Sequence, residues 1–223
     1  MDFMKWLNSL DELLYEVMSW LLFFPVTMWR AAVHPIRILH ETEAAAMLPE
    51  DQRYADVLSP PLFLALALLV AHAIATALGQ TDLIIANQHG LAALVTDNAS
   101  ALVLRIVIFA AFPLFLAARM VRRQKAKLDR ISLQQPFYGQ CYPAAIFALG
   151  ISTGASLGYD SHPLLQTIGH WLVVASIVNF WVVETLWFAK VLGIGYLRAC
   201  GNVLVGLLEG TLFLLAVGFL FTR

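Results

Sequence analysis

Five long apolar stretches alternate with shorter polar segments between residue 61 and the C-terminus. A membrane-crossing helix needs roughly 20 mostly apolar residues to traverse about 30 Å of hydrocarbon. The five stretches are close to that length, and the segments between them are too short to form a separate soluble domain. The pattern therefore predicts five transmembrane helices, over residues 61–78, 99–118, 140–157, 165–189 and 203–221.

The N-terminal segment follows a different pattern. Asp11, Glu12 and Glu16 recur at helical spacing on one face, and leucines and a valine occupy the other. This is typical of an amphipathic helix that lies in the membrane interface. The alternative is a sixth span over residues 13–29, which would place Glu16 near one end of a short span.

The chain divides on this pattern into two parts. Residues 1–60 contain the amphipathic helix and the longest polar stretch, and residues 61–223 contain the five spans. Pro60 and Pro61 suit the first turn of a helix at the boundary. Residues 79–98 carry two short apolar pieces, for which a short surface-lying helix is expected.

Composition supports a bilayer environment. Sixty per cent of the 223 residues are apolar, 13% are charged, and the mean hydropathy is +0.75. Soluble domains are nearer one half apolar and one quarter charged. The net charge of −1 excludes a strongly basic nucleic-acid binder, so nucleic acid is not an expected partner. The fold class expected is an all-α, polytopic transmembrane bundle of five spans plus an N-terminal amphipathic interfacial helix.

The distribution of Lys and Arg predicts an orientation. Residues 30–60 carry three basic residues, the four connections between the spans carry zero, six, zero and two, and the C-terminal tail carries one. Basic residues concentrate on the cytoplasmic side of membrane proteins. Residues 30–60 are therefore predicted to be cytoplasmic and the C-terminus to lie on the opposite side of the membrane. An interfacial first helix keeps the N-terminus cytoplasmic as well, whereas a sixth span would place it outside.

Two segments of the later half resemble a known family. FYGQCYPAAIFALG (residues 137–150) is similar to the third span of the Ypt-interacting-protein (Yip) family, and LWFAKVLGIGYLRACGNVLVGLLEGTLF (residues 186–213) resembles its fourth and fifth spans and the turn between them. The resemblance implies a cytoplasmic N-terminal region and five spans. Bacterial members have no settled activity and are often labelled permeases. The extended polar N-terminal domain of eukaryotic members is lacking, so a small-GTPase partner is not transferred, and a bacterial inner membrane with a periplasmic C-terminus is expected.

Ionisable residues inside predicted spans are candidates for a functional site, because their burial in a membrane is costly. Glu184 and Glu209 fall at matching depth, some 9 Å from the cytoplasmic end at ~1.5 Å per residue. They could form a proton or cation site, or they could pair with Lys190, Arg119 or Arg122 reaching in from the same side. The full candidate set of intramembrane polar residues is Arg105, Glu184, Glu209, His72 and Asn179.

Glycines recur every four residues in two spans. Small residues at this spacing let membrane helices approach closely, so the expected role is packing within the molecule or against a second copy. These glycines are Gly150, Gly154 and Gly158 in the third span, and Gly206 and Gly210 in the fifth.

A basic run follows the second span. Basic side chains beside a membrane attract anionic headgroups by about 1 kcal/mol each, so this run is the candidate lipid-headgroup site. Its basic residues are Arg119, Arg122, Arg123, Lys125, Lys127 and Arg130. The sequence shows no converging metal ligands and no catalytic set, so neither a metal nor a cofactor is expected.

These observations predict a non-enzymatic integral membrane protein that scaffolds or assists other membrane components. Membrane lipids are the expected partners, and other membrane proteins or a second copy of the chain are further candidates. The alternative function is a permease or channel-like transporter that uses Glu184, Glu209 and Arg105 in an ion, proton or lipid pathway.

Overall fold

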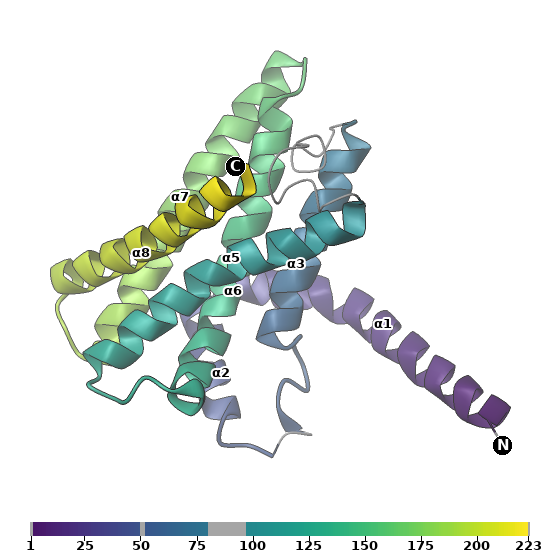
Figure 1. The fold of residues 1–223 in the computed structure, drawn as a ribbon, viewed down its shortest axis with the longest axis horizontal. Helices are drawn as coiled ribbons and strands as arrows, with labels where there is room; N and C mark the ends of the chain where they lie inside the picture. The colour runs from purple at the N-terminus through teal and green to yellow at the C-terminus, as the bar shows by residue number, and fades with distance from the viewer. Residues whose placement is uncertain (1, 50–51, 80–96, 223) are drawn as a thin grey trace.

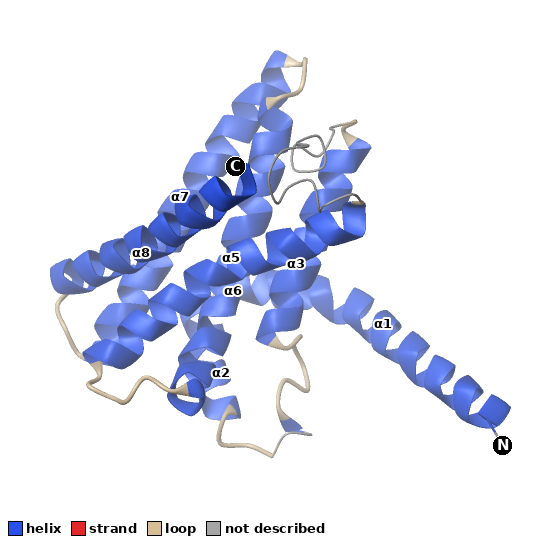
Figure 2. Ribbon diagram, viewed as in Figure 1, coloured by secondary structure: helices blue, strands red, loops and turns tan. Residues whose placement is uncertain are grey.

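The computed structural model describes residues 2–49, 52–79 and 97–222. In these ranges the chain forms helices and no strand, which confirms the all-α class (Figure 1; Figure 2). The surface helix expected within residues 79–98 falls almost wholly outside the described residues.

Seven helices make up the described chain, and five of them are long and apolar enough to cross a membrane. The helices outside this set of five are α1 (Asp2–Val33) and α2 (Pro35–Ala45). The five candidate spans are α3 (Pro60–Ala77), α5 (Asn98–Arg123), α6 (Arg130–Gly158), α7 (Pro163–Leu192) and α8 (Tyr196–Thr222). The structure thus confirms five spanning helices preceded by a separate N-terminal helix.

The predicted span ends were wrong at two helices. Helix α6 begins at Arg130 rather than at residue 140, and α8 begins at Tyr196 rather than at residue 203. Both helices extend into polar sequence. Hydropathy indicates where a helix enters an apolar environment, but it does not indicate where the hydrogen bonding of the helix begins.

Local sequence explains where the helices start. Asp97 accepts a hydrogen bond from the Ser100 backbone N–H at 2.7 Å, and Asp129 accepts one from the Ser132 backbone N–H at 2.9 Å. Both are capping boxes, in which the serine hydroxyl also bonds to the backbone of the capping aspartate. Prolines occupy the first turn of α2, α3 and α7, where a missing N–H costs nothing.

Helix α6 lies at the centre of the bundle. It packs against α3, α5 and α7, and α8 packs against α5 and α7. Ala144, Ala145 and Ala148 in the middle of α6 are buried, and their small side chains let the neighbouring helices approach. Aromatic side chains complete the core, including a stacked pair of Phe147 and Phe180 with centroids 4.6 Å apart.

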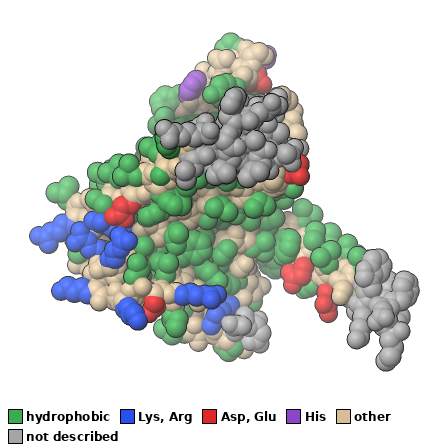
Figure 3. Space-filling model, viewed as in Figure 1, with side chains coloured by type: hydrophobic (Ala, Val, Ile, Leu, Met, Phe, Trp, Pro, Cys, Tyr) green, Lys and Arg blue, Asp and Glu red, His purple; other side chains and the backbone are tan. Residues whose placement is uncertain are grey.

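The outer faces of the five long helices remain apolar. Val107, Val178 and Leu212 are three of many large apolar side chains exposed on these faces, and apolar side chains cover much of the surface in Figure 3. An apolar surface of this extent is unfavourable in water and is the expected lipid-facing surface of a membrane bundle.

Helix α2 was not predicted, since residues 30–60 read as a polar stretch. It places Ile38 and Leu39 in the core, where both are fully buried. The segment that follows α2 is also attached to the bundle. Tyr142 of α6 donates a hydrogen bond to the Leu58 carbonyl of that segment at 2.6 Å. The apolar face of α2 is only a few residues wide and lies among charged residues, which concealed it in the sequence.

Helix α1 is attached to the bundle by its C-terminal turns alone. Thr27 and Ala31 are buried, and the Thr27 hydroxyl accepts a hydrogen bond from the Leu58 N–H at 3.0 Å. The N-terminal part of α1 projects away from the other helices (Figure 1). Its Leu14 and Leu21 are exposed in the structure, as are the acidic residues of its opposite face.

Candidate functional site

Basic side chains gather at one end of the bundle, which we call the basic end. It consists of the C-terminal ends of α5 and α7 and the N-terminal ends of α6 and α8. Arg119, Arg122 and Arg123 belong to the last turns of α5, and Arg198 belongs to the first turn of α8. Lys and Arg side chains form a group at the edge of the apolar surface in Figure 3.

Glu209 is neutralised at this end by two arginines of α5. Its Oε1 lies 3.3 Å from Arg119 Nη1, and its Oε2 lies 3.5 Å from Arg122 Nη1. The Glu209 and Arg119 side chains are 29% and 17% exposed, so the pair is only partly covered by the bundle. Of the two fates predicted for Glu209, pairing with an arginine from α5 is therefore the one that the structure shows.

Glu184 lies in a different environment. The residue is fully buried on the face of α7 that also carries Phe180 and Trp187. Its polar neighbour is the Gln140 amide of α6, which is fully buried as well. The two groups lie close enough to interact, but none of their four polar atoms forms a hydrogen bond of standard geometry with any described residue. A buried polar group without such a hydrogen bond is costly, so this pair is the most unusual feature of the core.

The structure gives Glu184 and Glu209 different neighbours. The sequence placed Glu184 and Glu209 at matching depth on consecutive helices, but Glu184 faces α6 and Glu209 faces α5. The residue number sets how deep a side chain lies along a helix, but the packing of the helices decides which neighbouring helix that side chain faces. The two carboxyl groups therefore have different polar neighbours in the described structure.

The other intramembrane candidates lie apart from these carboxyls. His72 on α3, Arg105 on α5 and Asn179 on α7 are each half-buried. Glu209 has its ion-pair partners on α5 and Glu184 has no hydrogen-bond partner, so neither glutamate bonds to these three side chains.

A third polar group was missed by sequence reasoning and joins α1 to α2. Arg30 donates hydrogen bonds to Glu41 at 2.7 Å and to Asp56 at 2.9 Å, and Arg37 donates one to Glu41 at 2.9 Å. The hydrogen bond that Arg30 donates to Asp56 is the main reason that the pKa of Arg30 is raised. Only the Arg37–Glu41 pair has a helical i, i+4 spacing, so it was the one part of this network with a sequence signal.

The predicted glycine positions differ in how closely they are packed. A side-chain carbon at Gly150 would overlap the Ser176 hydroxyl, and one at Gly154 would lie 2.8 Å from the Gly169 carbonyl oxygen. A carbon added at Gly206 would lie 2.9 Å from the Leu116 side chain of α5, and one added at Gly210 would lie 3.4 Å from the Phe112 ring, an ordinary contact distance. A carbon at Gly158 would meet no atom within 4 Å. Gly169 of α7, which the spacing rule did not single out, is the glycine that faces Gly154.

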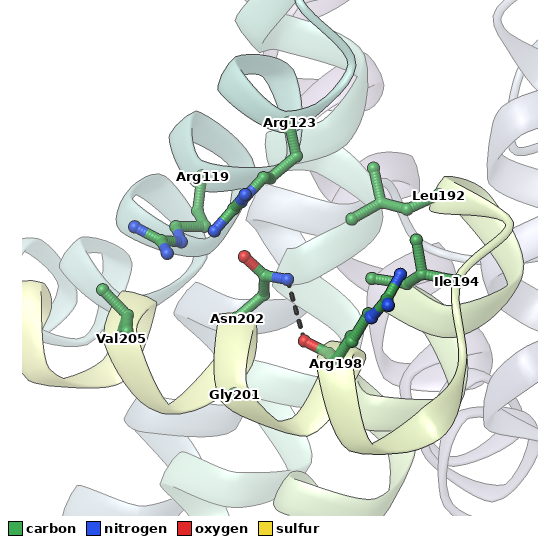
Figure 4. Close-up of a pocket in the computed structure, with 8 residues that line it drawn as sticks. All are labelled: Arg119, Arg123, Leu192, Ile194, Arg198, Gly201, Asn202 and Val205. Carbon is green, nitrogen blue, oxygen red and sulfur yellow. Dashed lines mark hydrogen bonds between the residues drawn. The ribbon is translucent and has the colours of Figure 1, made fainter.

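A cavity of about 460 Å³ opens at the basic end between α5, the turn after α7 and α8. Arg119, Arg123 and Arg198 line it together with Asn202, and the apolar side chains of its wall are Leu192, Ile194 and Val205 (Figure 4). Arg119 and Arg123 belong to the predicted headgroup set. Arg198 and Asn202 do not, because they lie some 75 residues further along the chain and meet the run only through the packing of α8 on α5.

Arg122 of the predicted headgroup set pairs with Glu209, Lys125 and Lys127 are exposed in the connection between α5 and α6, and Arg130 is exposed at the start of α6. No group of three or more His, Cys, Asp or Glu side chains that could hold a metal ion occurs among the described residues. Comparison with known proteins found no match, whether to a family model, a curated protein or a solved structure. The resemblance to the Yip family thus stays a prediction that depends on the two quoted segments.

Proposed function

We propose that this integral membrane protein is a non-enzymatic, Yip-like scaffold that assists other membrane components, with α1 lying in the membrane interface. The location proposed is a bacterial inner membrane, with the N-terminus in the cytoplasm and the C-terminus in the periplasm. The observation that carries the proposal is the form of α1, which is held at one end and carries an uncovered apolar stripe at the other.

The attachment of α1 favours a rigid arm. Its last turns are buried against the bundle at Thr27 and Ala31, and Arg30 bonds to both α2 and the segment after it. The helix is continuous from Asp2 to Val33 despite Pro25. An arm fixed in this way sets a defined direction for its free half, which a flexible tail cannot do.

The exposed stripe of α1 favours the membrane interface as its environment. Leu10, Leu14 and Leu21 are exposed on one face, and Glu12 and Glu16 are exposed on another. This segregation suits a helix whose apolar side enters the acyl chains and whose polar side stays in water. Helix α1 is also not one of the five helices long and apolar enough to span.

Site-directed spin labelling tests the position of α1. The Cys200→Ser background leaves Cys141, which is fully buried, and single cysteines are then placed at Leu14, Leu21 and Glu12 for labelling in liposomes. An interfacial helix places the labels at Leu14 and Leu21 at equal depth among the acyl chains and the Glu12 label in water. A helix that crosses the membrane would place Leu21 about 10 Å deeper than Leu14, and that result would overturn the proposal.

The second candidate function is a permease, which the buried Glu184–Gln140 pair favours. A membrane-embedded carboxyl with an unbonded amide beside it is the kind of group that can bind a proton or a small cation. Glu209 contributes less to this candidate because two arginines already neutralise it.

Flux measurements in proteoliposomes distinguish the two candidates. We expect no flux of protons, Na⁺ or K⁺ above that of empty liposomes, either for the wild type or for Glu184→Gln. A flux that Glu184→Gln abolishes, and that the exposed control Glu12→Gln leaves intact, would refute the scaffold and establish the permease.

A further inference from the structure

The cavity at the basic end combines positive charge with an apolar wall. Its volume of about 460 Å³ is within the usual range for small-molecule sites, roughly 300–1,000 Å³. It lies where the candidate spans α5 and α8 end, so it occupies the level of lipid headgroups. One part of its lining is formed by arginines and another by Leu192, Ile194 and Val205.

The charges around the cavity are unbalanced. Arg119 shares Glu209 with Arg122, which lies just outside the lining. Arg123 and Arg198 are exposed, and neither forms an ion pair with any residue that the structure describes. Three arginines line the cavity and a fourth lies just outside it, whereas Glu209 is the one carboxylate that forms an ion pair with any of the four among the described residues. Guanidinium groups bind phosphate oxygens through paired, charge-assisted hydrogen bonds.

Two buried polar atoms at the cavity lack partners. The Asn202 side chain donates one hydrogen bond to the Arg198 carbonyl at 2.8 Å, but its Oδ1 has no partner. The residue is 7% exposed, and Figure 4 shows its amide oxygen directed toward the arginines of α5. The Nε–H of Arg119 is also buried and unbonded. The site therefore offers an unused donor and an unused acceptor beside its charged groups.

We infer that this cavity binds a phosphate group whose substituent carries a hydroxyl, as in the headgroup of a glycerol phospholipid or in a soluble glycerol phosphate. The guanidinium groups of Arg123 and Arg198 hold the phosphate oxygens. The Asn202 Oδ1 accepts a hydrogen bond from the hydroxyl. The apolar wall contacts the carbon atoms next to the phosphate. This inference is independent of the role proposed for α1.

The variant Arg123→Gln/Arg198→Gln removes the two cations that have no ion-pair partner and so leaves the Arg119–Glu209 contact in place. Its matched control is Lys125→Gln/Lys127→Gln, which removes the same charge from exposed positions outside the cavity. Binding is measured with the full chain in an uncharged detergent, by native mass spectrometry and by thermal stabilisation. The probes are short-chain phosphatidylglycerol, phosphatidylmethanol with the same chains, and glycerol phosphate.

We expect the arginine variant to bind phosphatidylglycerol and phosphatidylmethanol about 25-fold more weakly than the wild type, since it removes two charged contacts and each contributes on the order of a fivefold effect. The affinity of the lysine control should stay within about twofold of that of the wild type, because its lysines lie outside the cavity and the uncharged detergent offers them no anionic membrane surface. Equal affinities of the wild type and the arginine variant, or an equal loss in the control, would overturn the site.

Two further comparisons define the ligand. Asn202→Leu should abolish a preference for phosphatidylglycerol over phosphatidylmethanol, and a wild type with no such preference would refute the hydroxyl contact. Binding of glycerol phosphate as tight as that of the lipid supports the site with a soluble ligand. Much weaker binding of glycerol phosphate supports the lipid headgroup as the source.

Discussion

Replacing Gly169 with alanine tests how closely α6 and α7 are packed. A side-chain carbon at this position would lie 2.5 Å from the Gly154 carbonyl oxygen and 2.6 Å from the Gly158 nitrogen. Ordinary contacts of this kind begin near 3.4 Å, so the shortfall is roughly 0.9 Å (3.4 less 2.5). Both neighbouring atoms belong to the backbone, and neither can rotate away as a side chain could.

The two helices must therefore separate by about 1 Å around this contact. A gap of 0.5–1 Å already loses roughly a quarter to a half of the dispersion energy of each contact it affects. Inserting a methyl group into a packed core typically costs about 1–3 kcal/mol. The better helix propensity of alanine offsets up to about 1 kcal/mol of this. The net loss expected is about 2 kcal/mol.

Thermal unfolding in detergent, followed by the loss of the monodisperse chromatographic peak, measures the effect. A loss of about 2 kcal/mol corresponds to a decrease of roughly 4–8 °C in Tm for a chain of this size. Gly158→Ala is the matched control, because a carbon there meets nothing within 4 Å and Tm should not fall. The reasoning is refuted if Gly169→Ala is as stable as the wild type or if both variants lose the same amount.

Three further predictions concern polar contacts. Glu209→Gln should destabilise the protein by no more than about 1 kcal/mol, because the ion pairs that Glu209 forms are partly exposed. The loss of stability should be smaller in high salt, and a larger loss in high salt would contradict the pairing. Tyr142→Phe should cost about 1–2 kcal/mol in chemical unfolding, since the buried Leu58 carbonyl loses its donor, and an unchanged stability would show that another donor replaces it. Hydrogen bonds from Ser132 hold the pKa of Asp129 below its ordinary value. The Asp129 carboxylate therefore stabilises the fold at a pH above its pKa in the unfolded chain, and this stabilisation is lost as the pH falls through its lower pKa in the folded chain. Asp129→Asn keeps a capping oxygen and should flatten this part of the acid dependence of Tm; an unchanged profile would exclude the cap as its source.

The five spans could be predicted because their signal is local. Length and apolarity are properties of one segment, and both are required for crossing a bilayer. The ends of α6 and α8 could not be placed in the same way, since their first turns are polar and are held by capping and backbone hydrogen bonds. Helix α2 was missed for a related reason: its buried face includes Ile38 and Leu39 but is interrupted by charged residues that face outward.

The contacts at the candidate sites depend on pairings between distant parts of the chain. Arg119 and Glu209 are 90 residues apart, and Arg30 and Asp56 are 26 apart. Helical periodicity states which residues share a face but does not state which helix that face will meet. Sequence reasoning could therefore name Arg119 as one partner of a buried carboxylate, yet it could not choose between Glu184 and Glu209.

The contrast between these two glutamates narrows the search for a membrane-embedded activity. Helix α8 packs on α5, so Glu209 meets an arginine run that also neutralises it. Helix α7 packs most extensively on α6, and no described Lys or Arg forms an ion pair with Glu184 there. The structure retains a glutamate and a glutamine there, with no hydrogen bond that would offset their burial. A stabilising role explains Glu209, whereas packing alone does not explain the Glu184–Gln140 pair, so a test for transport has its sharpest target at Glu184.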